Sequence, residues 1–133
     1  MIKRRTAFVL FFKGNRIMLQ NRESYSKYGE EYGFFGGGIE EGENEEQALR
    51  REIKEELGIN IKNYKFFKHD IISVKEVSGE IERFVFIAPI PDIAKLNVKE
   101  GKIAIMNFED SFNLKMVSGD VKLLKEIYES LKK

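Results

Sequence analysis

The stretch GGGIEEGENEEQALRREIKEELGI, residues 36–59, decides the fold of this chain. It begins with three glycines and continues into an acidic segment in which Glu52, Glu55 and Glu56 stand at helical positions i, i+3 and i+4, so their carboxylates share one face. The helical neighbours of Glu52 carry no positive charge, and only Glu55 has a basic neighbour, Arg51. Clustered carboxylates without counter-charges favour a hard divalent cation such as Mg²⁺.

The fixed positions of this stretch follow a defined spacing. Five residues separate Gly37 from Glu43, and seven more separate Glu43 from Arg51. The chain then reads Glu, aliphatic, any, Glu, Glu, any, Gly, aliphatic, ending at Ile59. This pattern resembles the Nudix box, the signature of hydrolases that cleave a nucleoside diphosphate linked to another group, and every fixed position is filled. Phe35 stands where many family members carry proline, a change that alters loop stiffness but removes no catalytic group.

The segments around the box predict an α/β fold from the residues themselves. Runs of β-branched and aromatic residues separated by turn residues predict strands, and apolar residues at helical spacing predict helices. The predicted strands are 5–12 and 16–22, joined as a hairpin, followed by 32–35, 64–77, 80–90 and 102–108, and the predicted helices are 45–57 and 121–131. Strands interrupted by helices favour helices covering a mixed sheet. The resemblance implies an α/β/α sandwich with a mixed β-sheet and one Nudix hydrolase domain over residues 1–133.

The two helices also carry end signals. Asn44 is a favoured N-cap with Gln47 three residues later, and Gly58 can take the left-handed position that ends a helix. Asp120 is the predicted N-cap of the last helix. The apolar stripe of the first helix is Leu49, Ile53 and Leu57. This stripe lies beside the glutamate face, so the helix can bury one side and present its acids to a cleft.

The acidic face can supply the chemistry of pyrophosphate hydrolysis, which uses a metal ion at the phosphate oxygens, a positioned water and a carboxylate that accepts its proton. Glu52 and Glu56, one helical turn apart, are the leading ligand candidates, with Glu55 as a third ligand or as the base. The residues alone do not divide these roles. Gly36, Gly37 and Gly38 lack a Cβ and allow the backbone to approach phosphates. The resemblance implies Mg²⁺ or Mn²⁺ as cofactor and the Gly36 carbonyl as a ligand.

Five further residues are candidates outside the acidic face. The resemblance implies that Arg51 and Glu43 pair and hold the loop against the helix, which orients the carboxylates. Arg22 ends a strand where related proteins often place a phosphate-contacting arginine; the alternative is a surface arginine. Glu100 lies in a late loop where some family members add an acid for metal binding or water activation; the alternative is a solvated glutamate. Asn107 falls where nucleotide-selective relatives read the base.

Composition limits the class of partner. The 23 basic and 22 acidic residues nearly cancel, so no global field attracts nucleic acid or an anionic membrane. The sequence has no cysteine, which excludes disulfides and thiolate metal sites, and no apolar run long enough to span a bilayer. These features predict a cytoplasmic protein without a membrane or nucleic-acid partner, and the resemblance implies a small nucleotide as substrate. Homodimers are common in the family, but no pattern here identifies an interface.

Several functions are compatible with the box. The leading prediction is a MutT-like pyrophosphohydrolase that converts a nucleoside triphosphate, including oxidised forms, to the monophosphate and pyrophosphate. The alternative is an ADP-ribose or dinucleoside polyphosphate hydrolase. A non-catalytic nucleotide sensor is disfavoured because such proteins usually lose a box glutamate and this chain keeps all of them. Removal of pyrophosphate from RNA 5′ ends is disfavoured by the near-neutral charge.

Overall fold

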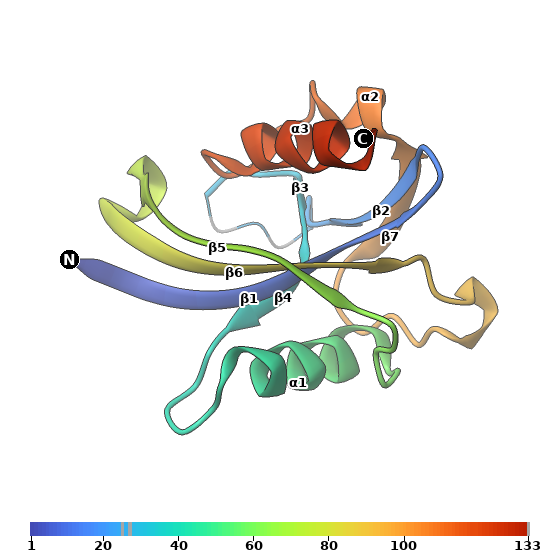
Figure 1. Ribbon diagram of the computed structural model, residues 1–133, viewed down its shortest axis with the longest axis horizontal. Coiled ribbons are helices and arrows are strands. Elements are labelled where there is room, and N and C mark those ends of the chain that lie inside the picture. Colours follow the sequence, from blue (N-terminus) through green and yellow to red (C-terminus); the bar gives the residue numbers. More distant parts are fainter. Residues whose placement is uncertain (25, 27, 133) are drawn as a thin grey trace.

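The sheet at the centre of this computed structural model separates two helical layers (Figure 1). The structure describes residues 1–132 except residues 25 and 27. The strands in this part of the chain are β1 (Ile2–Lys13), β2 (Arg16–Asn21), β3 (Tyr32–Gly33), β4 (Phe35–Gly38), β5 (Lys65–Val74), β6 (Gly79–Pro89) and β7 (Lys102–Asn107). The helices are α1 (Glu45–Leu57), α2 (Phe108–Ser111) and α3 (Asp120–Leu131), with short 3₁₀ turns at Lys75–Val77 and Ile93–Lys95. The predicted mixed sheet with flanking helices is confirmed.

Strand β1 organises the sheet. It pairs in parallel with β6 along nearly its whole length, from Ile2 opposite Glu80 to Phe12 opposite Pro89. Its other edge is shared, with β4 against residues 6–9 in the middle and β2 against the last residues, both antiparallel. Strand β2 continues the sheet through β7, and β5 covers the outer edge of β6. The predicted hairpin of the first two strands is therefore confirmed.

The strands are buried on both faces, because successive side chains of a strand point to opposite sides. On β1, Ala7 and Val9 face α1, whereas Leu10 faces α3. The first core contains the α1 stripe Leu49, Ile53 and Leu57, all with no exposed surface, as the sequence predicted. The second core contains Phe108 of α2 and Leu123, Leu124 and Ile127 of α3. Helix α1 is thereby fixed against the underside of β1 and β4.

Helix α1 has the bounds and caps that the sequence predicts. Asn44 accepts a hydrogen bond from the backbone N–H of Gln47 at 2.8 Å, and the Gln47 side chain accepts from the backbone N–H of Asn44 at 2.9 Å. Gly58 ends the helix in the left-handed conformation, with φ of 71°. Because both ends are set by local hydrogen bonds, the register of the glutamates on α1 is fixed by the sequence next to them.

Two local expectations are wrong. The glycine stretch is not a loop: Gly36–Gly38 belong to β4, which pairs with residues 6–9 of β1. Gly36 has φ of 140°, and a Cβ there would collide with the carbonyl of Ala7, so only glycine lets β4 lie this close. Asp120 is not the N-cap of α3. That position belongs to Gly119, with φ of 93°, and the Asp120 side chain lies in the interior.

Candidate active site

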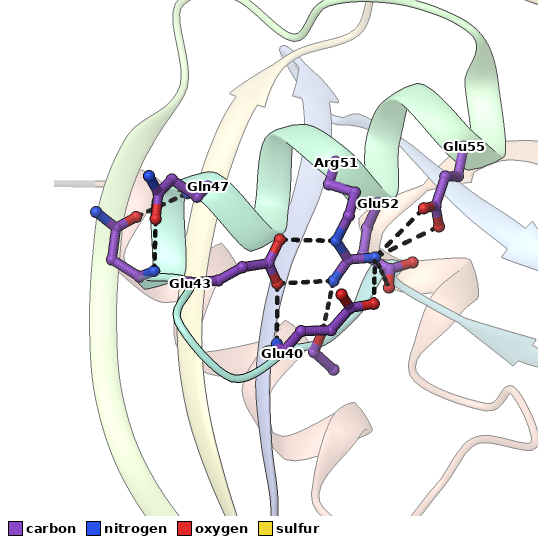
Figure 2. A network of polar contacts seen from close by, with 8 residues as sticks. Glu40, Glu43, Gln47, Arg51, Glu52 and Glu55 are labelled. Atoms are coloured by element: carbon purple, nitrogen blue, oxygen red, sulfur yellow. Dashed lines mark hydrogen bonds and ion pairs between the residues drawn. The ribbon is translucent and has the colours of Figure 1, made fainter.

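Arg51 is the centre of a polar network that joins α1 to the segment before it (Figure 2). Its Nε and Nη2 donate to the two carboxylate oxygens of Glu43 at 2.7 and 2.9 Å. Nη2 also donates to the carbonyl of Gly38 at 2.9 Å, and Glu43 accepts from the backbone N–H of Glu40 at 2.9 Å. The structure thus contains the Arg51–Glu43 pair that the resemblance implied, and this pair ties the end of β4 to α1.

The same guanidinium reaches Glu52, contrary to the expectation that no cation lies beside it. Arg51 Nη1 donates to Glu52 Oε1 at 2.9 Å and lies 3.4 Å from Glu55 Oε2. Neighbours on a helix face are residues three and four positions apart, so this contact was not predicted. The long Arg51 side chain bends toward β4 and meets the residue next to it in sequence. Hydrogen bonds from Arg51, then from the Glu40 backbone, lower the pKa of Glu43 to about 2. The bond to Glu43 raises the pKa of Arg51 above its usual range.

Glu56 is the most deeply buried of the three helix glutamates, with 4% of its surface exposed. Its Oε1 accepts a hydrogen bond from the backbone N–H of Gly36 at 2.8 Å. Burial raises the pKa of Glu56 to about 8, opposed by the Gly36 N–H and reinforced by the charges of Glu52 and Glu100. Burial also raises the pKa of Glu52, against the lowering effect of Arg51. An acidic pair with shifted proton affinity in a cavity wall is typical of a functional site.

The carboxylates of Glu52 and Glu56 line a cavity of about 280 Å³. Its acidic wall is Gly36, Gly37, Glu52, Glu56 and Glu100. Its other walls come from β1, β5, β6, the residue between β3 and β4, and the segment that begins α3, and include Phe8, Phe34, Ile72, Ile81, Arg83, Ser118 and Asp120. Gly37 makes room for the acid, since a Cβ at that position would lie 2.6 Å from Glu52 Oε1. The cavity therefore joins α1 on one side of the sheet to the start of α3 on the other.

The donor set fits a hard divalent cation in type and charge. Glu52, Glu56 and Glu100 offer only oxygen, and the pKa of Glu56 is raised partly because the other two acids are near. A bound cation would offset that repulsion. With side chains as they lie, no three His, Cys, Asp or Glu residues in the described part of the chain stand close enough together to hold a metal ion. The fit is therefore one of chemistry rather than of a completed coordination shell.

The structure gathers some predicted site residues at the cavity and leaves others away from it. Arg22 lines the cavity, but its Nε donates to Gln20 at 2.8 Å and its Nη2 to the carbonyl of Phe34 at 2.9 Å. Glu55 is half exposed and is not among the lining residues. Asn107 is not among the lining residues: it pairs with Arg16, at the end of β7 remote from Lys102 and Glu100. Gly38 lies beyond the cavity wall and holds Arg51 through its carbonyl.

Sequence reasoning missed most of the lining residues outside the acidic wall, among them the charged residues Arg4, Glu30, Arg83 and Asp120. A usable signal existed for Arg83, because it occupies the inward row of β6 between Ile81 and Val85, where a charge is out of place. For Asp120 the signal was masked, since an acid at a helix start also fits a cap. Arg4 gave no signal: it is an exposed residue among the basic residues at the chain's start.

The NUDIX domain model matches residues 2–127, which is nearly the whole chain. The chain belongs to the Nudix family. Among curated proteins, this Nudix chain is 45% identical over 56 residues to the NAD-capped RNA hydrolase NudC of Haemophilus influenzae. That match covers 41% of the chain and only 21% of the relative, so the aligned segment spans about a fifth of that protein.

Solved structures share the Nudix fold over most of the chain. The ORF135 protein of E. coli is 24% identical, with a TM-score of 0.76 over 99% of this chain and 92% of that one. The MutT protein of Bacillus halodurans is 21% identical, with a TM-score of 0.73 over 92% of this chain and 80% of that one. The domain model over residues 2–127 carries the family assignment, and these solved structures show the shared fold. In the described residues, no helix has the length and apolarity to cross a membrane.

Proposed function

We propose that this protein is a metal-dependent pyrophosphohydrolase that cleaves a nucleoside triphosphate, including oxidised forms, to the monophosphate and pyrophosphate. The observation that carries the proposal is the single cavity that has Glu52 and Glu56 in one wall and Asp120 in another. Its volume of about 280 Å³ is at the low end for ligand pockets, which favours one nucleoside over two.

In this proposal the chain holds the reactants rather than forming a covalent bond with them. Mg²⁺ or Mn²⁺, when bound, supplies charge stabilisation of the phosphate oxygens. Glu52 and Glu56 would hold the cation, and Glu100 adds a third acid to the same wall of the cavity. A carboxylate of this group accepts the proton of the attacking water. Arg51 keeps Glu52 in place through its 2.9 Å hydrogen bond while its other nitrogens are anchored to Glu43 and Gly38.

Arg4 is the proposed contact for the phosphates. Arg22, the residue expected from the resemblance, already donates to Gln20 and Phe34 and lies 3.5 Å from Glu30. Arg4 lines the same cavity and, in the described part of the chain, makes no ion pair. Its guanidinium is beside Gly38, at the acidic end of the site. An uncommitted guanidinium next to a metal-binding wall suits a polyphosphate.

A turnover screen tests the proposal. The protein is assayed with Mg²⁺ or Mn²⁺ against the common nucleoside triphosphates, 8-oxo-dGTP, ADP-ribose, NADH, diadenosine polyphosphates and NAD-capped RNA. Release of pyrophosphate together with a nucleoside monophosphate supports the proposal. The matched control is Glu41→Gln, an exposed box residue, which should keep full activity. Absence of triphosphate turnover under all conditions would refute the proposed substrate class.

A second candidate is hydrolysis of a nucleoside diphosphate joined to another nucleoside or sugar. It is favoured by the 45% identity to the NAD-capped RNA hydrolase over 56 residues. The cavity volume opposes it, because a dinucleotide would have to place its second half outside the described cavity. Preferential turnover of NADH, ADP-ribose or NAD-capped RNA in the same screen would select this candidate.

A further inference from the structure

Arg83 is a buried cation with one nitrogen that the protein does not use. Its side chain is 6% exposed and projects from β6 into the cavity wall. Its Nε and Nη2 donate to the two carboxylate oxygens of Asp70 on β5, at 2.8 and 2.7 Å. Its Nη1 is buried and, within the described residues, has no hydrogen-bond partner. A buried N–H group without a partner is costly, so an unpaired group of this kind points to a ligand.

An acceptor stands beside this unused donor. Asp120 Oδ1 lies 3.9 Å from Arg83 Nη1, too far for a hydrogen bond, and the Asp120 carboxylate has no hydrogen-bond partner within the described part of the chain. On the other side, Asp70 is fully engaged, because Lys68 also contacts it at 3.1 Å while bound to Glu126 at 2.7 Å. The ion pair behind Arg83 is thus complete, and Arg83 and Asp120, the residues that carry the unused donor and acceptor, both line the cavity.

The walls near this pair are flat and apolar. Phe8 and Phe34 stack with ring centres 4.8 Å apart and an angle of 15° between the rings. Ile72 and Ile81, paired across β5 and β6, also line the cavity. A planar ring with hydrogen-bonding groups on one edge suits such a site, because its faces contact apolar side chains and its edge meets the polar pair.

We propose that Arg83 is a specificity-determining residue, which donates from Nη1 to a carbonyl acceptor on the edge of a nucleobase while Asp120 accepts from the neighbouring N–H of that base. Asp70 is a positioning residue: its two hydrogen bonds fix the guanidinium so that only Nη1 faces the ligand. This inference rests on the proposed function for its ligand class. It goes further in assigning the reading of the base to a strand residue, Arg83, and to Asp120 at the start of α3. A site built to bond a polar edge rejects analogues that lack it.

Equilibrium binding tests the assignment without turnover. Isothermal titration measures Kd for two pairs of ligands that differ in the carbonyl oxygen and keep the neighbouring N–H: GMP against 6-thio-GMP, and UMP against 4-thio-UMP. In the parent we expect the better-bound pair to differ roughly 10- to 100-fold. Arg83→Met should reduce this ratio to below about threefold, because the carbonyl then has no donor to lose. Asp70→Asn should reduce it partly, an effect that a purely structural Asp70 would not produce.

The controls separate binding from folding. Arg5→Met removes an exposed arginine whose partner is Glu82 on the same strand as Arg83, and it should leave the ratio unchanged. If Arg83→Met fails to fold, Arg83→Lys is used instead, because lysine keeps a positive charge beside Asp70. Its single nitrogen cannot bond both Asp70 oxygens and also hold an N–H toward the base, so the ratio of the two Kd values should still fall. A ratio that persists in both variants, equal loss for both ligands of a pair, or no measurable parent binding to any of the four nucleotides would overturn the assignment. A parent that binds with this ratio but hydrolyses no triphosphate would instead refute only the proposed function.

Discussion

Arg51→Lys is the most direct test of the bracing network. The guanidinium donates twice to Glu43, once to the Gly38 carbonyl and once to Glu52. A lysine ammonium can keep the ion pair with Glu43, but its single nitrogen cannot serve acceptors on three sides. We therefore expect the loss of about two hydrogen bonds, which at roughly 1 kcal/mol each for a partly exposed group lowers the free energy of unfolding by about 2 kcal/mol.

Urea melts measure this change directly. With a slope of roughly 2 kcal/mol per molar urea, the midpoint should fall by about 1 M. The same preparations should show kcat and metal affinity reduced by roughly 10- to 100-fold, because Glu52 loses the donor that orients it. Arg50→Lys is the matched control: its side chain is half exposed and contacts Tyr64, so the expected change is within about 0.5 kcal/mol. An Arg51→Lys protein as stable as the parent, with unaltered metal binding, would refute the bracing role; a raised KM alone would indicate a direct phosphate contact.

Four further outcomes follow from the site. Activity should disappear after exhaustive chelation and return with Mg²⁺ or Mn²⁺; unchanged turnover in the chelated protein would contradict the metal requirement. Glu52→Gln and Glu56→Gln should each lower kcat by about two orders of magnitude, or roughly 3 kcal/mol, without unfolding the protein, as steady-state kinetics and thermal melts on one preparation will show. Arg4→Met should raise KM with little change in kcat, whereas an equal fall in kcat would argue against a simple phosphate contact. Burial raises the pKa of Asp120 from 3.8 to about 7, so the folded state holds its proton more tightly and the free energy of unfolding of the metal-free protein falls as pH rises from about 4 to about 7. In Asp120→Asn, the free energy of unfolding from denaturant melts should depend less on pH over this interval, and the dependence that is left is due to Glu56. An unchanged slope of this free energy against pH would show that Asp120 is not the group responsible.

Features set by neighbouring residues could be predicted from the sequence. The bounds of α1, the capping hydrogen bonds between Asn44 and Gln47, and the left-handed Gly58 depend on contacts within a few positions. The grouping of Glu52 and Glu56 on one face follows from helical periodicity alone. The pairing of Arg51 with Glu43 came from the family resemblance, since nothing in the spacing by itself brings the two together.

Features that depend on distant segments could not be predicted. The glycines form β4 because β1 lies alongside them. Glycine has no side chain, so these three residues show no alternation of apolar and polar side chains that would have predicted a strand. Asp120 enters the cavity because α3 begins beside β5 and β6, a contact between segments far apart in the chain. Asn107 was expected at the site, but the antiparallel register with β2 places it opposite Arg16, away from the acidic wall. The position of a residue on its strand was visible in the sequence, and the register of that strand was not.

The parallel pairing of β1 with β6 has a consequence for the order of folding. The hairpin of β1 and β2, strand β4 and helix α1 are close in the chain and can form soon after they are synthesised, whereas β6 is made much later. Closing a long loop to bring β6 to β1 costs entropy before its contacts form, which slows this step. Until then the long edge of β1 is exposed and can pair with another chain. Nascent chains that end before Gly79 should therefore contain the whole glutamate helix and yet aggregate, and completion of β6 is the step that protects the growing protein.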